Sequence, residues 1–197
     1  MLLFSFVSGE QIPDAAKPKA LQIDEQLFRR IGASDMTAFD ELYHLTERTL
    51  YAYALSLAKN HEEALDLMQD TYVKVISAAH LYKPMGKPLA WLFTIAKNLY
   101  LSKLRKNKRE VYSDSGGIAD GAGFSYVTDP EDKIVLEAAL NLLSDEERQI
   151  VLLHAVSGLK HMEIAHSIGL TLSTTLSKYH RALKKLRYHL EERGTLK

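Results

Sequence analysis

The chain of 197 residues lacks cysteine and carries no formal net charge. Without cysteine, disulfide bonds, thiolate metal sites and a nucleophilic thiol are all excluded. The opening segment Met1–Val7 is apolar, but it is far too short to span a bilayer and lacks the basic start of a secretion signal. We expect residues 1–23 to form a poorly ordered tail. The composition is compatible with a reducing cytoplasm.

Zero net charge would by itself argue against a nucleic-acid partner, so the distribution of the charges matters more than their sum. Residues 97–109 contain six Lys or Arg and no acid, and residues 178–187 contain a second basic block. Acids concentrate in residues 62–70 and 110–132. This separation predicts two basic patches and an acidic face, and therefore more than one kind of partner.

Apolar residues recur at helical spacing along most of the chain, and no segment alternates convincingly as a strand. The predicted helices span residues 24–31, 35–58, 61–79, 88–107, 132–142, 145–156, 160–167 and 172–192. Ser144 with Glu147 three positions later is the sequence of a capping box. Gly, Ser and Asp dominate residues 111–130, which predicts a flexible acidic linker. We expect an all-α chain of two helical domains, residues 24–110 and 131–193.

Residues 157–190 have the pattern of a helix-turn-helix. Lys160–His166 fits a short first helix, Gly169 a turn residue with positive φ, and Thr171 the cap of a second helix. The predicted buried stripe of that second helix consists of Leu176, Tyr179, Leu183, Leu186 and Leu190. The opposite side, suited to a major groove, carries Thr174, Ser177, Lys178, Arg181 and Lys185. A solvated charged surface is the alternative for a basic run alone, but the glycine turn followed by Ser and Thr favours DNA.

The helix predicted over residues 61–79 has an acidic side and a buried side. The buried side consists of Leu65, Met68, Tyr72, Val75 and Ile76, whereas the acidic arc consists of Glu62, Glu63, Asp66 and Asp70, with Gln69 at its border. Plain solvent surface is the alternative interpretation of this arc.

The helix predicted over residues 88–107 begins with Pro88, which suits a first turn. Its apolar face consists of Leu89, Leu92, Phe93, Ala96, Leu99, Tyr100 and Leu104, and its polar face of Trp91, Thr94, Asn98, Ser102 and Arg105. An aromatic ring can stack on a base while cations bind phosphates, so this face favours nucleic acid. Packing of Trp91 against a neighbouring helix is the alternative.

These segments together resemble bacterial RNA polymerase sigma factors of the sigma-70 family, in the extracytoplasmic-function (ECF) group, which have only the sigma-2 and sigma-4 domains. The resemblance covers about residues 27–107 and 132–190 and is carried by the segments Ala38–Ile76, Pro88–Lys106 and Leu140–Arg187. It implies a cytoplasmic protein that binds core RNA polymerase and promoter DNA, without enzymatic activity, cofactor, metal or small-molecule substrate. An anti-sigma factor is a further partner common in the family.

The resemblance also implies roles for individual residues. The acidic element that docks on the coiled coil of the polymerase clamp matches Asp66, Gln69 and Asp70, and the sigma-4 domain would meet the polymerase flap. The −10 element would be read by the loop His80–Lys87 and the helix after it, with the matching positions Tyr82, Lys83, Asn98, Ser102, Lys103, Arg105 and Lys106. The −35 element would be read by Thr171, Ser173, Thr174, Ser177, Lys178 and Arg181. The chain departs from the family at Ser102, where Asp is common. It also departs at Thr175, where Val is common, and at Leu176, where a basic residue is common. Leu176 therefore fits either the core or a DNA-facing position.

Two other classes of protein are weighed against this interpretation. An operator-binding regulator with an N-terminal sensor domain would explain the helix-turn-helix, but it would leave the acidic arc and the Trp91–Arg105 face without a use. An α-helical metalloenzyme would need ligand spacing among the eight histidines. His161 and His166 do not share a helix face, and His154 belongs to a different predicted helix.

The linker prediction can be tested by limited proteolysis of the free protein. Cleavage should occur first between Val111 and Pro130, because a protease readily accommodates exposed Gly- and Ser-rich backbone. The masses of the earliest fragments should correspond to two helical domains. Resistance of this segment while other sites are cut would contradict a flexible linker.

Overall fold

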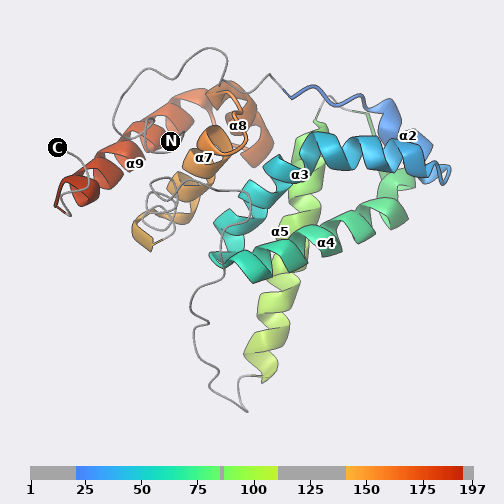
Figure 1. The fold of residues 1–197 in the computed structure, drawn as a ribbon, viewed down its shortest axis with the longest axis horizontal. Helices are drawn as coiled ribbons and strands as arrows, with labels where there is room; N and C mark the ends of the chain where they lie inside the picture. The colour runs from blue at the N-terminus through green and yellow to red at the C-terminus, as the bar shows by residue number, and fades with distance from the viewer. Residues whose placement is uncertain (1–20, 85–86, 111–140, 193–197) are drawn as a thin grey trace. The chain divides into compact units, whose positions relative to one another are not determined.

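The computed structural model describes residues 21–84, 87–110 and 141–192 (Figure 1). Its elements are α2 (Gln26–Gly32), α3 (Met36–Ala58), α4 (His61–Ala78), the 3-10 turn η2 (Ala79–Leu81), α5 (Pro88–Glu110), α7 (Asp145–Ala155), α8 (His161–Ile168) and α9 (Leu172–Glu192). Every regular element in these ranges is a helix, so the predicted all-α class is confirmed. The elements through α5 belong to one compact unit and α7–α9 to a second. The predicted tail, linker and helix 132–142 lie wholly or largely outside the described residues.

Short polar caps set the boundaries of α3 and α4. The Asp35 carboxylate accepts hydrogen bonds from the backbone N–H groups of Thr37, at 3.0 Å, and Ala38, at 3.2 Å. The hydrogen bonds from the Thr37 side chain, the Ala38 backbone and Arg30 lower the pKa of Asp35 to about 2. Asn60 caps α4 by accepting from the Glu63 backbone at 3.1 Å. The sequence therefore determines both helix starts locally.

Helices α3, α4 and α5 share the core of the N-terminal unit. Tyr53 of α3 stacks on Phe93 of α5 with ring centroids 4.0 Å apart, and burial raises the pKa of Tyr53 to about 12. Among the described side chains of α5, residues 88–106, the buried ones are Leu89, Leu92, Phe93 and Ala96, all in the first half of the helix. Figure 1 shows the remainder of α5 running past α4.

The predicted buried side of α4 and the predicted apolar face of α5 both extend beyond the residues that are buried. Ile76 and Leu104 are each 38 % exposed, and Leu65 is half-buried. The described helices of this unit cover α5 only as far as its middle turns, so the apolar spacing continues beyond the packed part of the helix. The prediction of burial was therefore wrong for Ile76.

The local signals of the helix-turn-helix are confirmed in the C-terminal unit. Ser144 and Glu147 form the predicted capping box at the start of α7. Gly169 has φ 76° at the end of α8, and a Cβ there would meet nothing within 4 Å. Glycine is therefore required by the backbone conformation and not by a lack of space. Thr171 caps α9 by accepting from the Thr174 backbone at 3.2 Å.

The buried stripe of α9 is rotated from the predicted one. It consists of Thr175, Tyr179, Ala182, Leu186 and Leu190. Leu176 and Leu183 flank it and are only half-buried. Thr175 can be buried because its hydroxyl donates to the Thr171 carbonyl at 3.0 Å, which satisfies the polar group within the helix.

Two ion pairs join α9 to the start of α7. Lys185 Nζ lies 2.7 Å from Oε2 of Glu147, whose side chain is 2 % exposed, and Lys178 Nζ lies 2.7 Å from Oε2 of the half-exposed Glu146. Burial alone would raise the pKa of Glu147, but the hydrogen bonds from Lys185 and from Ser144 outweigh it and lower the pKa. Lys178 and Lys185 therefore lie on the flank of α9 that faces α7, and not at the centre of its outer face.

We predict that Glu147→Gln lowers the free energy of unfolding at pH 7 by about 1–3 kcal/mol, because it removes a buried charge-assisted hydrogen bond. Since folding lowers the pKa of Glu147 from 4.5, its stabilisation is present above pH 4.5 and is lost as the pH falls through the folded-state pKa. The difference from wild type should therefore shrink on acidification. Urea unfolding followed by circular dichroism at several pH values measures it.

The matched control is Glu146→Gln, which removes a charge from the neighbouring, half-exposed pair with Lys178. Exposed pairs contribute about 0–1 kcal/mol, so this variant should be nearly as stable as wild type. If both variants lost the same free energy of unfolding at pH 7, the burial of Glu147 would not strengthen its ion pair.

Candidate nucleic-acid interface

The outer side of α4 presents an acidic surface. Asp66, Gln69 and Asp70 are all exposed, at positions i, i+3 and i+4, and neither carboxylate pairs with a cation among the described side chains. One or two turns further along the same side, Val73 is 62 % exposed, next to the partly exposed Ile76. The helix therefore offers charges that are open to a basic partner, together with an apolar extension that sequence reasoning missed. Val73 and Ile76 could have been found by continuing the seven-residue step from Asp66 and Gln69.

From Thr94 onward, α5 carries the predicted polar and basic residues on its surface. The exposed positions are Thr94, Asn98, Ser102, Lys103, Arg105 and Lys106. Arg105 donates from Nε to the Leu101 carbonyl at 3.2 Å, which holds the base of its side chain against the helix. The amide of Asn98 offers both a donor and an acceptor from an exposed position. The arrangement suits hydrogen bonding to a base edge beside phosphate-binding cations.

Tyr82 and Trp91 lie together in an aromatic cluster with Phe28. The Phe28 and Tyr82 rings stack with centroids 4.2 Å apart, and Trp91 meets both rings edge-on at 5.2 and 5.3 Å. Tyr82 also donates its hydroxyl to Oε1 of Glu25 at 2.7 Å. Of the two alternatives for Trp91, the structure therefore has the packed one. Sequence reasoning missed Glu25 and Phe28, because the sequence carries no local signal for a contact across 57 positions.

Helix α9 presents Ser173, Ser177 and Arg181 as exposed side chains, with Thr171 exposed just before it. Thr174 and Lys178 are only half-buried, and each already has a partner: the Thr171 hydroxyl for Thr174 and Glu146 for Lys178. Among the cations predicted to read DNA from α9, Arg181 is therefore the more accessible one. The helix-turn-helix places these groups on the side of α9 opposite its buried stripe.

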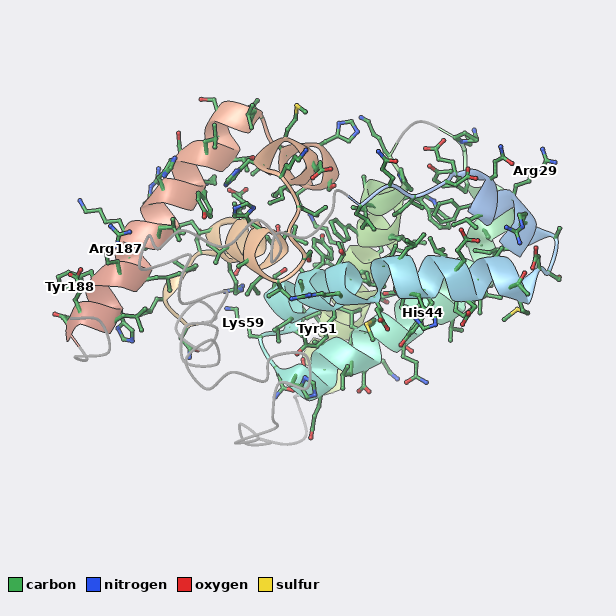
Figure 2. All side chains as sticks on the ribbon, turned by 45° about the horizontal axis from the view of Figure 1, so that its top comes forward. Arg29, His44, Tyr51, Lys59, Arg187 and Tyr188 are labelled. Atoms are coloured by element: carbon green, nitrogen blue, oxygen red, sulfur yellow. The ribbon has the colours of Figure 1, made fainter. Side chains whose placement is uncertain are left out.

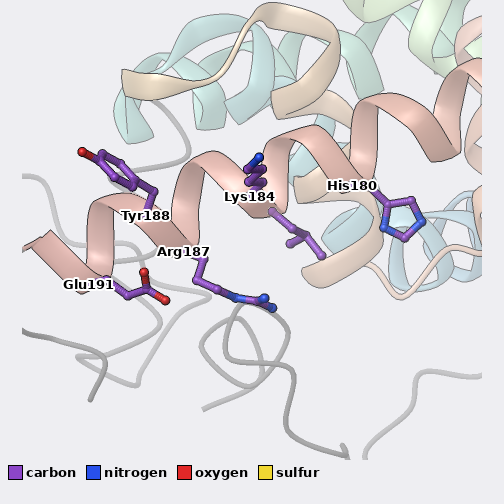
Figure 3. A pocket seen from close by; sticks show the side chains of 6 residues that line it. His180, Lys184, Arg187, Tyr188 and Glu191 are labelled. Atoms are coloured by element: carbon purple, nitrogen blue, oxygen red, sulfur yellow. The ribbon is translucent and has the colours of Figure 1, made fainter.

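The same outer side continues into a shallow pocket that sequence reasoning missed (Figure 3). Its lining consists of His180, Leu183, Lys184, Arg187, Tyr188 and Glu191. Figure 2 shows Arg187 and Tyr188 projecting outward from α9. The signal was present in the sequence, because at 100° per residue Lys184 lies close to the direction of Ser177. Lys184 and Arg187 belong to the basic block that the sequence predicts over residues 178–187, and the pocket that they line is the feature that the sequence did not predict.

Helix packing brings together two histidines that the sequence places in different helices. The rings of His154 and His161 lie 4.3 Å apart, with Tyr179 packed edge-on against both. Burial lowers the pKa of His154, and burial with the charges of His154 and His180 lowers the pKa of His161 to about 4. Both rings are therefore neutral packing groups at pH 7. No three His, Cys, Asp or Glu side chains in the described part of the chain are arranged to hold a metal ion.

Two family models match the chain, Sigma-70 region 2 over residues 42–110 and Sigma-70, region 4 over residues 133–186. The ECF RNA polymerase sigma factor EcfG of Rhodopseudomonas palustris is 33% identical over 143 residues, which cover 70% of this chain and 77% of that protein. The ECF RNA polymerase sigma factor SigM of Bacillus subtilis is 30% identical over 151 residues, which cover 75% of this chain and 92% of that protein.

Two solved structures are similar in fold. The sigma factor RpoE in complex with the anti-sigma factor NepR from Bartonella quintana matches with a TM-score of 0.61 and 30% identity, over 78% of this chain and 96% of that one. CnrH in complex with the cytosolic domain of CnrY matches with a TM-score of 0.60 and 22% identity, over 86% of this chain and 97% of that one. This match supports the fold alone. The chain therefore belongs to the sigma-70 family, among the ECF RNA polymerase sigma factors, which direct promoter-specific transcription initiation.

Proposed function

We propose that this sigma factor docks on core RNA polymerase through α4 and reads promoter DNA through α5 and α9. The observation that carries the proposal is the separation of charge on the surface. An open acidic strip lies on α4, a polar and basic strip on α5, and a second one on α9, each directed away from the core of its unit. One acidic and two basic surfaces match one protein partner and two DNA elements. The domain roles follow, with residues 24–110 as the sigma-2-like part and 131–193 as the sigma-4-like part.

On α4, Asp66, Gln69 and Asp70 are the proposed contacts to the coiled coil of the polymerase clamp. Their support is their exposure and the lack of a cationic partner for either aspartate within the described ranges. No ion pair of these aspartates with another described side chain has to be broken when a basic partner binds. The attraction between the aspartates and that partner is therefore not reduced by the cost of breaking such a pair. The C-terminal unit would contact the polymerase flap.

The proposed −10 contacts divide into base-reading and phosphate-binding groups. Tyr82, Lys83 and Asn98 would meet a base that is flipped from the non-template strand. The phosphates beside it would be bound by Ser102, Lys103, Arg105 and Lys106. Unstacking a base costs a few kcal/mol, and a pocket with phosphate contacts offsets that cost only for the fitting sequence. Opening of the duplex then becomes part of promoter selection.

The proposed −35 contacts are Thr171, Ser173, Thr174, Ser177, Lys178 and Arg181. The direction of α9 favours the exposed Ser173, Ser177 and Arg181 for the groove itself. Lys178 is held by Glu146 at 2.7 Å, so a phosphate contact from Lys178 has to compete with that pair. We therefore assign the leading cationic contact to Arg181.

The remaining parts of the proposal concern partners and location. The protein would act in the cytoplasm with polymerase and DNA, and would itself make or break no covalent bond. Similarity to an RpoE structure solved with the anti-sigma factor NepR supports an anti-sigma factor as a regulatory partner. Such a partner would compete for the same exposed surfaces.

Reversing the charge of the α4 surface should weaken binding to core polymerase. The double variant Asp66→Lys and Asp70→Lys should compete poorly with labelled wild-type protein for core polymerase. Its stability should change little, because exposed substitutions usually cost less than about 0.5 kcal/mol. The control is Asp40→Lys with Glu41→Lys, which makes the same change of charge at exposed positions of α3. Normal competition by the α4 variant would mean that this face is only solvent surface.

Substitutions on α5 and α9 should impair different steps of initiation. Asn98→Ala should reduce promoter opening and −10 preference, because it removes an uncharged donor and acceptor. Arg181→Ala should weaken closed binding at the −35 element. If Arg181 contacts a phosphate, the loss of affinity should be nearly the same for all −35 sequences, and the slope of log affinity against log salt concentration should fall by about one. If Arg181 contacts a guanine, discrimination between bases at one position of the −35 element should fall by about 1–3 kcal/mol.

Permanganate footprinting measures opening, and a salt-dependent mobility shift measures closed binding. Both variants should still bind core polymerase, since neither position lies on α4. Indistinguishable defects would contradict the division into two reading surfaces. Normal opening by Asn98→Ala would remove that residue from the site.

A further inference from the structure

We propose that α2 is a positioning element for promoter opening, in which Glu25, Phe28 and Gly32 hold Tyr82 in the orientation that meets the −10 strand. The inference rests on the role proposed for Tyr82. The three residues precede the segment that matches Sigma-70 region 2, residues 42–110, so the family match assigns them nothing. Three separate contacts from α2 carry the argument.

The first contact lies beneath the Tyr82 ring. Phe28 is fully buried and stacks on Tyr82 with an interplanar angle of 28°, while Trp91 closes the edge of both rings. Leu27 and Ile31, buried on either side of Phe28 in the sequence, anchor α2 to the core of its unit. The Tyr82 ring therefore packs on a buried side chain of α2, whereas the basic residues of the site belong to α5.

The second contact is at the tip of the ring. The Tyr82 hydroxyl donates to the Glu25 carboxylate at 2.7 Å, directly before α2 begins. A hydrogen bond to an ionised acceptor is about twice as strong as a neutral one. Held on its face by Phe28 and at its tip by Glu25, the ring is restricted in both tilt and direction. The entropy of ordering it is lost on folding and not again when DNA binds, which is the advantage of preorganisation.

The third contact is between backbones. A Cβ added to Gly32 would lie 3.1 Å from both the backbone N and the Cα of His80. Glycine at the end of α2 therefore allows the helix to approach η2 two residues before Tyr82. The Tyr82 N–H then donates to the Ala79 carbonyl at 3.0 Å, which fixes where the chain leaves η2. The position of α2 thus determines both the path of the chain and the direction of the ring.

A role in packing alone would need the rings but not the hydroxyl–carboxylate pair. Tyr82→Phe keeps the ring and removes the donor, Glu25→Ala removes the acceptor, and Glu25→Gln keeps an acceptor oxygen without the charge. Glu41→Ala is the matched control, because Glu41 also contacts α2 but does so through Arg30, at 3.7 Å. These variants separate positioning from general stability.

The full-length variants are assembled with core polymerase, and open complexes are measured by permanganate footprinting. Glu25→Ala and Tyr82→Phe should each reduce open complexes roughly three- to tenfold, as expected for loss of a hydrogen bond to a charged group. The double variant should be no worse than either single variant, and Glu25→Gln should restore most of the activity. Competition for core polymerase and closed binding at −35 should stay unchanged.

The chain has a single tryptophan, so tryptophan fluorescence of the free protein, excited where tyrosine does not absorb, reports on this cluster alone. Glu25→Ala should make Trp91 more accessible to acrylamide quenching, because the Tyr82 ring beside it is released. Glu41→Ala should leave quenching and opening as in wild type. Gly32→Ala should increase quenching by a different route, through displacement of α2 from His80.

The outcomes distinguish this inference from the function on which it rests. If Tyr82→Ala blocks opening while Glu25→Ala, Glu25→Gln and Tyr82→Phe open promoters as wild type does, α2 does not position the ring and the inference is wrong. If Tyr82→Ala itself opens promoters normally, the role proposed for Tyr82 is wrong and the inference fails with it. If Glu25→Ala and Tyr82→Phe defects simply add in the double variant, the two groups act independently and the inference is again wrong.

Discussion

The packing of the first half of α5 against α3 and α4 is the contact on which the N-terminal unit depends. The Tyr53–Phe93 stack and the buried residues from Leu89 to Ala96 fix that half in the core. The same helix then continues past the described helices of its unit, so Asn98 and the cations after it are exposed without a separate structural element. One helix therefore supplies both a packed anchor and the surface that we propose for nucleic acid, and the anchor sets the direction of that surface.

In the C-terminal unit, charge pairing adds to the core packing that holds α9. Glu147 is satisfied by its own capping box and by Lys185, so its carboxylate is buried without an unpaired charge. Lys178 and Glu146 repeat the contact two turns earlier. The buried stripe from Thr175 to Leu190 sets the rotation of α9 about its axis, and the ion pairs to α7 agree with it, so that Ser177 and Arg181 face outward. Lysines that a sequence pattern assigns to DNA can thus stabilise the fold instead. Their partners lie on another helix, which a helical wheel of α9 alone does not show.

The sequence was sufficient for features that depend on neighbours along the chain. The Ser144 capping box, the positive φ of Gly169 and the Thr171 cap each follow from a few adjacent residues, and the structure has all three. Burial was predicted less well, because it depends on where neighbouring helices end. Spacing alone cannot reveal that Ile76 lies on the exposed side of α4 beside Val73, that Leu104 lies beyond the packed part of α5, or that a hydroxyl bonded within its own helix allows Thr175 to be buried. The contact between Glu25 and Tyr82 had no local signal at all. The roles of the predicted contact residues remain proposals.

The neutral net charge has a physical consequence for how promoters are selected. Lys178 and Lys185 are held by the acids of α7, which leaves α9 with less charge available to DNA than its sequence suggests. Non-specific affinity for DNA comes chiefly from neutralised phosphates, so the C-terminal unit alone should bind any duplex weakly. Weak binding by each unit is sufficient when both are carried on one polymerase, because tethering turns the second contact into an intramolecular one. We therefore expect a chain of balanced charge to avoid being held at random sites, and strong binding to require both promoter elements and the polymerase together.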